Sequence, residues 1–82
     1  MLHEFALVQD LLENALSALK SKKAKKVKTI EVDVGESSGY SSESLQQAYD
    51  ILSADTELRG TKLVLRKVKG REVILKRLVM ET

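Results

Sequence analysis

The sequence contains no cysteine, no proline, no tryptophan and a single histidine in 82 residues. Without cysteine the chain forms no disulfide, no thiolate zinc or iron–sulfur site, and offers no thiol nucleophile. One histidine excludes a metal site built from several imidazoles of the same chain. No apolar run approaches the ~20 residues of a membrane-spanning helix, and no basic segment precedes an apolar core at the start. We therefore expect a cytoplasmic protein without a membrane partner.

The residues that are present describe one small folded domain spanning residues 1–82. Hydrophobic residues make up 43% and charged residues 32% of the chain, and the net charge is +2. This composition argues against disorder, and so weak a net charge does not by itself assign a nucleic-acid partner. A chain of this length buries only about 60–65% of its unfolded surface, so a partner or a second copy would add useful stability.

Two segments have helical periodicity. In residues 4–21 apolar side chains recur at spacings of three and four, which predicts an amphipathic helix that ends among lysines. A second helix is predicted from Ser41 or Ser42 to about Ala54, with either serine as the N-cap and Glu43 in the first turn. Neither segment contains a glycine or proline that would interrupt it.

Three segments are typical of strands. Residues 27–35 alternate polar and apolar side chains, and residues 61–68 and 72–80 are strand-like on either side of Lys69-Gly70-Arg71. That short glycine-containing turn predicts a β-hairpin. The order helix-strand-helix-strand-strand predicts an α/β (α+β) two-layer sandwich, in which two helices pack on a three-stranded sheet. The strand order stays open, because the pattern does not decide whether the first strand pairs with the second or the third. The predicted core comprises Phe5, Val8, Leu12, Leu16, Ile30, Val32, Val34, Leu45, Tyr49, Leu52, Leu63 and Leu65.

A glycine-containing loop and a lysine cluster could each bind phosphate groups, but their residues do not specifically indicate this function. The loop Gly35-Glu36-Ser37-Ser38-Gly39 lacks the Gly-Lys-Ser/Thr ending of a phosphate-binding loop, so we interpret it as a connection. Six lysines between Lys20 and Lys28 could contact phosphates, but no aromatic residue is interleaved with them for base stacking. A solvated helix end is the preferred interpretation, and docking to an acidic protein surface stays open.

The N-terminus offers a metal site through its position. A free Met1 amine, the main-chain nitrogens of Leu2 and His3, and the His3 imidazole can together bind one metal ion. Four nitrogens in a plane suit Ni(II) or Cu(II) better than Zn(II). The two amides must lose their protons to bind, so affinity rises with pH. Glu4 could add an oxygen ligand or an outer contact.

Several motifs resemble the HypA/HybF family of nickel metallochaperones. The opening His3-Glu4-Phe5-Ala6-Leu7-Val8-Gln9 is similar to the family's first motif. The resemblance continues through Lys25–Glu36, Ser37-Ser38-Gly39, Glu43–Asp50, Leu58–Leu63 and Val73–Leu78. It implies a nickel-binding domain, not an enzyme, that delivers Ni(II) to [NiFe]-hydrogenase or urease precursors together with a HypB-like GTPase. His3 would be the imidazole ligand, Met1 and Leu2 would supply main-chain nitrogens, and Glu4 would assist.

The sequence departs from this family pattern in two places. The family carries a four-cysteine zinc module between its last two strands, whereas here the turn near residues 69–71 closes the gap and no zinc is expected. The family's histidine directly follows the initiator Met, whereas here Leu2 intervenes. The four-nitrogen plane that results also suits copper and releases metal slowly. The alternative is a metal-independent interaction module, or a homodimer formed through an exposed sheet edge.

Overall fold

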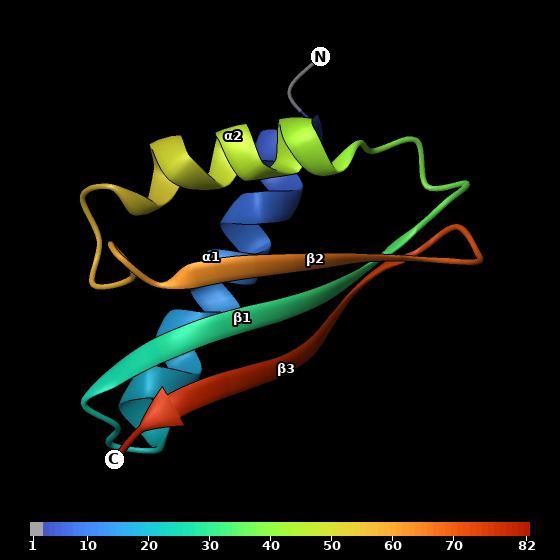
Figure 1. The fold of residues 1–82 in the computed structure, drawn as a ribbon. Helices are drawn as coiled ribbons and strands as arrows, with labels where there is room; N and C mark the ends of the chain where they lie inside the picture. The colour runs from blue at the N-terminus through green and yellow to red at the C-terminus, as the bar shows by residue number, and fades with distance from the viewer. Residues whose placement is uncertain (1–2) are drawn as a thin grey trace.

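The computed structural model describes residues 3–82, which form two helices and three strands in the predicted order (Figure 1). The elements are α1 (His3–Ser21), β1 (Lys26–Gly35), α2 (Ser42–Ser53), β2 (Lys62–Val68) and β3 (Val73–Glu81). The helices lie on one side of the sheet, and the sheet's other face is open. The predicted two-layer α/β sandwich is confirmed. Within residues 3–82 no helix has the length and apolar character needed to span a membrane.

Both helices have ends that the sequence explains. Ser41 is the N-cap of α2, and its Oγ accepts a hydrogen bond from the Ser44 N–H at 3.0 Å. At the end of α1, the N–H groups of Lys23 and Ala24 donate to the carbonyls of Lys20 and Leu19. This is the Schellman arrangement, in which the residue after the helix is left-handed. Lys23 takes that position with φ 52°, where glycine is usual.

The sheet has the strand order β2-β1-β3, so the predicted hairpin is wrong. β2 pairs with β1 in parallel, and β3 pairs with β1 in the antiparallel direction on the opposite side. The segment between β2 and β3 therefore crosses the carboxyl end of β1 instead of folding back along β2. The predicted turn at Lys69-Gly70-Arg71 exists, but it joins two edge strands that do not touch along their length.

The crossing depends on a close approach at Gly35. Its N–H donates to the Glu72 carbonyl at 2.8 Å, and the Ser37 N–H donates to the Gly70 carbonyl at 2.8 Å. A Cβ atom on Gly35 would lie 2.5 Å from the Gly70 carbonyl oxygen. Gly70 itself has φ +117°, which other residues rarely adopt. Two glycines therefore let the connection pass over the end of the central strand.

The core lies between the helices and the inner face of the sheet. Eight of the twelve predicted core residues are buried, and Phe5, Leu16, Leu52 and Leu65 pack against them while partly exposed. A register shift between Val27 and Thr29 turns both Val27 and Ile30 inward, which strict alternation does not anticipate. The buried hydrophobic residues missing from the prediction are Leu11, Ala15, Leu19, Val27, Ala48 and Leu58.

Candidate functional site

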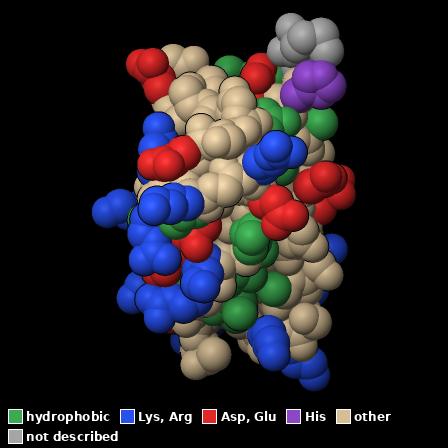
Figure 2. All heavy atoms as spheres, turned by 90° about the vertical axis from the view of Figure 1, so that its right-hand side faces the viewer, with side chains coloured by type: hydrophobic (Ala, Val, Ile, Leu, Met, Phe, Trp, Pro, Cys, Tyr) green, Lys and Arg blue, Asp and Glu red, His purple; other side chains and the backbone are tan. Residues whose placement is uncertain are grey.

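The predicted metal-binding terminus begins where the described residues begin. Met1 and Leu2 lie outside the described residues, and His3 is the first residue of α1. The His3 imidazole, purple in Figure 2, is exposed at the top of the molecule. Glu4 follows in the first turn of the helix and is partly buried. Val8 and Leu12, both buried, hold this end of α1 in the core.

The start of a helix suits main-chain coordination. The first four N–H groups of an α-helix have no acceptor within the helix, so metal binding by the His3 amide nitrogen would break no hydrogen bond of α1. The positive end of the helix dipole disfavours a bare cation there. Two deprotonated amide ligands, as the sequence analysis expects, would cancel the double positive charge of Ni(II) and so remove this electrostatic cost.

The rest of the described chain contributes no second set of metal-binding side chains. No group of three or more His, Cys, Asp or Glu side chains comes together within residues 3–82. The loop that follows β1 is confirmed as a connection: the Glu36 N–H donates to the Val68 carbonyl at 2.7 Å, and the Glu36 side chain is exposed.

The sequence analysis missed a buried hydrogen-bond network that connects three elements. The Tyr49 hydroxyl on α2 donates to the Thr61 carbonyl at 2.8 Å. Thr61 Oγ1 donates to the Val27 carbonyl of β1 at 2.6 Å, and the Thr61 N–H donates to the carbonyl of fully buried Leu58. Burial is the main cause that raises the pKa of Tyr49 above its ordinary value of 10.0. The network fixes residues 58–60, which the sequence indicated only as a connection, and residue 61, the predicted start of a strand.

The open face of the sheet carries ion pairs beside exposed apolar side chains, since Val64 lies opposite Glu31 and Ile74 opposite Asp33. Arg77 of β3 donates to Glu31 of β1 at 2.9 Å, and Arg66 of β2 donates to Asp33 of β1 at 3.3 Å. Acidic side chains of the central strand thus bridge to both neighbours. Both arginines are more than half exposed, so each pair contributes little, roughly 0–1 kcal/mol.

Two helices on one side of a mixed three-stranded sheet place the chain in the class of small two-layer α/β domains, here with an exposed imidazole at the first residue of α1. Comparison with known families identifies the family. Residues 2–73 match the family described as "Hydrogenase/urease nickel incorporation, metallochaperone, hypA". The chain belongs to the HypA family.

Individual relatives agree with this assignment. The chain is 33% identical over 70 residues to the hydrogenase maturation factor HypA of Caldanaerobacter subterraneus subsp. tengcongensis, which covers 85% of this chain and 61% of that protein. It is 33% identical over 67 residues to HypA of Methanocella arvoryzae, with 82% and 59% covered. The chain thus spans about 60% of the length of the curated relatives it matches.

Solved structures have the same fold. The solution structure of the Ni metallochaperone HypA from Helicobacter pylori superposes with a TM-score of 0.72 over 90% of this chain and 70% of that chain, at 17% identity. A second solution structure, of a HypA protein, gives a TM-score of 0.66 over 94% of this chain and 71% of that chain. The mixed three-stranded sheet with two helices is therefore the family's fold.

Proposed function

We propose that this chain binds Ni(II) as cargo and takes part in nickel delivery for the maturation of [NiFe]-hydrogenase or urease. Membership of the HypA family is the observation that carries the proposal. Residues 1–82 would form one HypA-like nickel-binding domain that acts by binding and not by catalysis, in the cytoplasm. A HypB-like GTPase and the precursor of the nickel enzyme would be its partners.

The proposed ligands are the Met1 amine, the main-chain nitrogens of Leu2 and His3, and the His3 imidazole. His3 is the only imidazole of the chain and is exposed. Its position at the first residue of α1 supports the proposal, because the amides at a helix start are not committed to the helix. Glu4 would assist from the first turn, as an oxygen ligand or as an outer contact.

Titration of Ni(II) into protein with a native, untagged N-terminus tests the site. The expected product is a yellow, diamagnetic, equimolar complex, followed by its absorption band and by NMR. His3→Ala and N-terminal acetylation should each abolish this complex, since one removes the imidazole and the other the free amine. Glu4→Gln is the matched control and should have a smaller effect, because four nitrogens already complete the plane.

Two further measurements separate this site from others. An alanine inserted before Met1 moves the imidazole to the fourth position and should break the chelate. Affinity should fall as the pH is lowered, because protons compete with nickel for the imidazole and for both amide nitrogens. If acetylated protein binds nickel as tightly as native protein, nickel binds elsewhere and the ligand assignment is wrong.

We further propose that the domain needs no zinc. The chain has no cysteine, and the four residues between β2 and β3 carry no zinc ligand set. A homodimer through a sheet edge is the alternative function. The β2 edge does not favour it, because this edge strand carries Lys62, Arg66 and Lys67, and charged side chains on an edge strand oppose pairing with another strand.

A further inference from the structure

The charges of this protein are segregated along the chain. All 14 lysines and arginines lie within residues 20–28 and 59–77. β1 begins inside the first of these segments, and β2 begins inside the second. The two strands pair in parallel from Thr29 opposite Lys62, so their starting ends lie side by side. Cations far apart in the sequence therefore meet at the amino-terminal end of the sheet.

A hollow of about 320 Å³ lies at this end of the sheet. Lys26 and Lys28 of β1 line one side, Glu57 and Arg59 of the segment before β2 line the other, and the wall between them is formed by Val27, Gly60 and Thr61. Lys26, Lys28 and Arg59 are all exposed. We call this hollow, with the cations Lys26, Lys28 and Arg59 that line it, the amino-terminal hollow, because β1 and β2 begin beside it. Within residues 3–82 the structure gives these cations one ion pair, between Lys26 and Glu81 at 3.8 Å.

Helix capping does not explain these three cations. Lysines at the end of α1 are stabilised by the negative end of the helix dipole, but that effect is confined to the last turn. Lys28 lies inside β1, and Arg59 comes from a different part of the chain. Like charges gathered around one hollow repel, and among the described residues the structure gives a carboxylate partner to Lys26 alone of these three.

The two sides of the amino-terminal hollow are held rigidly. Thr61 binds the Val27 carbonyl through its side chain, and its own carbonyl accepts from the buried Tyr49 hydroxyl. These hydrogen bonds join the segment that carries Arg59 to the strand that carries Lys26 and Lys28. A preformed site loses less conformational entropy when it binds a partner.

We propose that the amino-terminal hollow is a docking site for an acidic segment of a partner protein. A segment with several aspartate or glutamate side chains complements three converging cations. Single carboxylates already lie beside them: Glu57 lines the hollow and Glu81 pairs with Lys26. The proposal does not depend on nickel, and metal-free protein is used to test it.

The surroundings of the hollow favour carboxylates over a nucleic acid. The three aromatic residues of the chain serve the core: Tyr49 is buried, and Phe5 and Tyr40 are partly buried against it. No ring is left at the hollow on which bases could stack.

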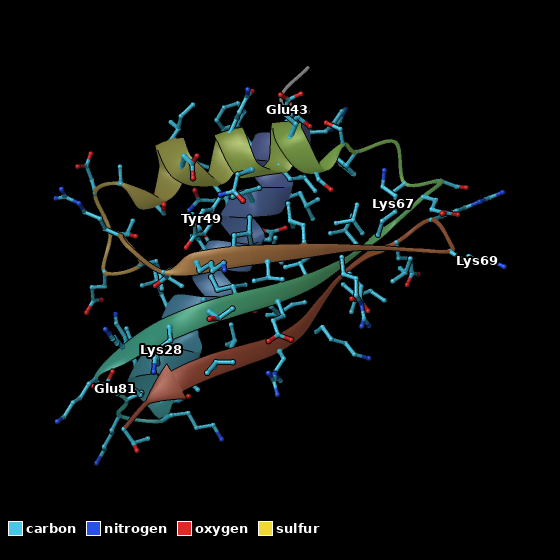
Figure 3. All side chains as sticks on the ribbon, in the orientation of Figure 1. Lys28, Glu43, Tyr49, Lys67, Lys69 and Glu81 are labelled. Carbon is cyan, nitrogen blue, oxygen red and sulfur yellow. The ribbon has the colours of Figure 1, made fainter. Side chains whose placement is uncertain are left out.

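A fluorescein-labelled octaglutamate peptide is the probe, and its binding is measured by fluorescence polarisation at low salt. The test variant carries Lys26→Gln, Lys28→Gln and Arg59→Gln. The matched control carries Lys67→Gln, Lys69→Gln and Arg71→Gln, which removes the same charge from the opposite end of the sheet. Figure 3 shows Lys28 at one end of the sheet and Lys67 and Lys69 at the other.

The hollow variant should bind octaglutamate about ten-fold more weakly, while the control variant should change binding by about two-fold or less. NMR shifts on titration should map to Lys28, Gly60 and Thr61. Equal loss in both variants would overturn the proposal, because net charge would then explain the binding. Absence of octaglutamate binding to the parent protein would overturn it too. Tighter binding of a single-stranded DNA oligomer, lost in the hollow variant, would assign the hollow to nucleic acid instead.

Discussion

Replacing Tyr49 by phenylalanine removes one hydroxyl from the core and keeps the ring. The side chain is 3% exposed, and its hydroxyl donates to the Thr61 carbonyl at 2.8 Å. Loss of this bond leaves a buried carbonyl without its donor, which costs about 1–2 kcal/mol of unfolding free energy. For a domain of this length that corresponds to a fall of about 4–16 °C in Tm.

The same hydroxyl gives the prediction a pH dependence. Burial raises the pKa of Tyr49 in the folded state above the 10.0 of an exposed tyrosine. Below pH 10 the hydroxyl is protonated in both states, and its full contribution to stability is present. As the pH rises above 10, the unfolded state releases the proton first, which destabilises the folded parent. The stability difference between parent and Tyr49→Phe should therefore shrink as the pH rises through the raised pKa.

Urea unfolding followed by circular dichroism, from about pH 8 to about pH 11, measures this difference directly. Other titrating groups are shared by parent and variant and cancel in the comparison. Tyr40→Phe is the control, since Tyr40 lies in the loop before α2 and takes no part in the network. A difference that stays constant or grows above pH 10 would refute the reasoning.

Three further predictions rest on the backbone and on the absence of cysteine. Gly35→Ala should lower the unfolding free energy, measured by urea titration, by about 1–3 kcal/mol, because the added methyl meets the backbone of the connection between β2 and β3. Unchanged stability would contradict that close approach. Lys23→Gly should raise stability by about 1 kcal/mol, since glycine accepts the left-handed conformation without strain, and Lys22→Gly is the control that should not. EDTA should leave the Tm unchanged by differential scanning fluorimetry, and a large fall would reveal a structural metal.

The secondary structure was predictable because local patterns specify it. Apolar residues at spacings of three and four predicted both helices, and Ser41, the N-cap of α2, was one of the two serines predicted for that position. Strand alternation placed β1 within one residue at its start. Each of these signals lies within a few neighbouring residues, so the sequence contains it without reference to the fold.

The strand order was not predictable from such patterns. A short glycine-containing segment is compatible with two paths of the chain. It can join two strands that pair as a hairpin, or it can join two strands on opposite sides of a third by crossing the end of that strand. What decides between them is the contact between Gly35 and Gly70, which are far apart in the sequence. Leu58 and Thr61 were missed for a similar reason, since their burial depends on partners in β1 and α2 and not on any local periodicity.

The proposed nickel-binding terminus and the amino-terminal hollow lie at opposite ends of α1. His3 begins that 19-residue helix, and the lysine-rich segment that leads into β1 follows its last turn. At 1.5 Å per residue the helix separates them by roughly 27 Å. A partner seated at the hollow would therefore leave the terminal imidazole accessible. At this distance, with no shared side chain, changes at the two sites should act independently. Metal capture and partner docking can thus be attributed to separate residues, and the failure of either proposal would leave the other standing.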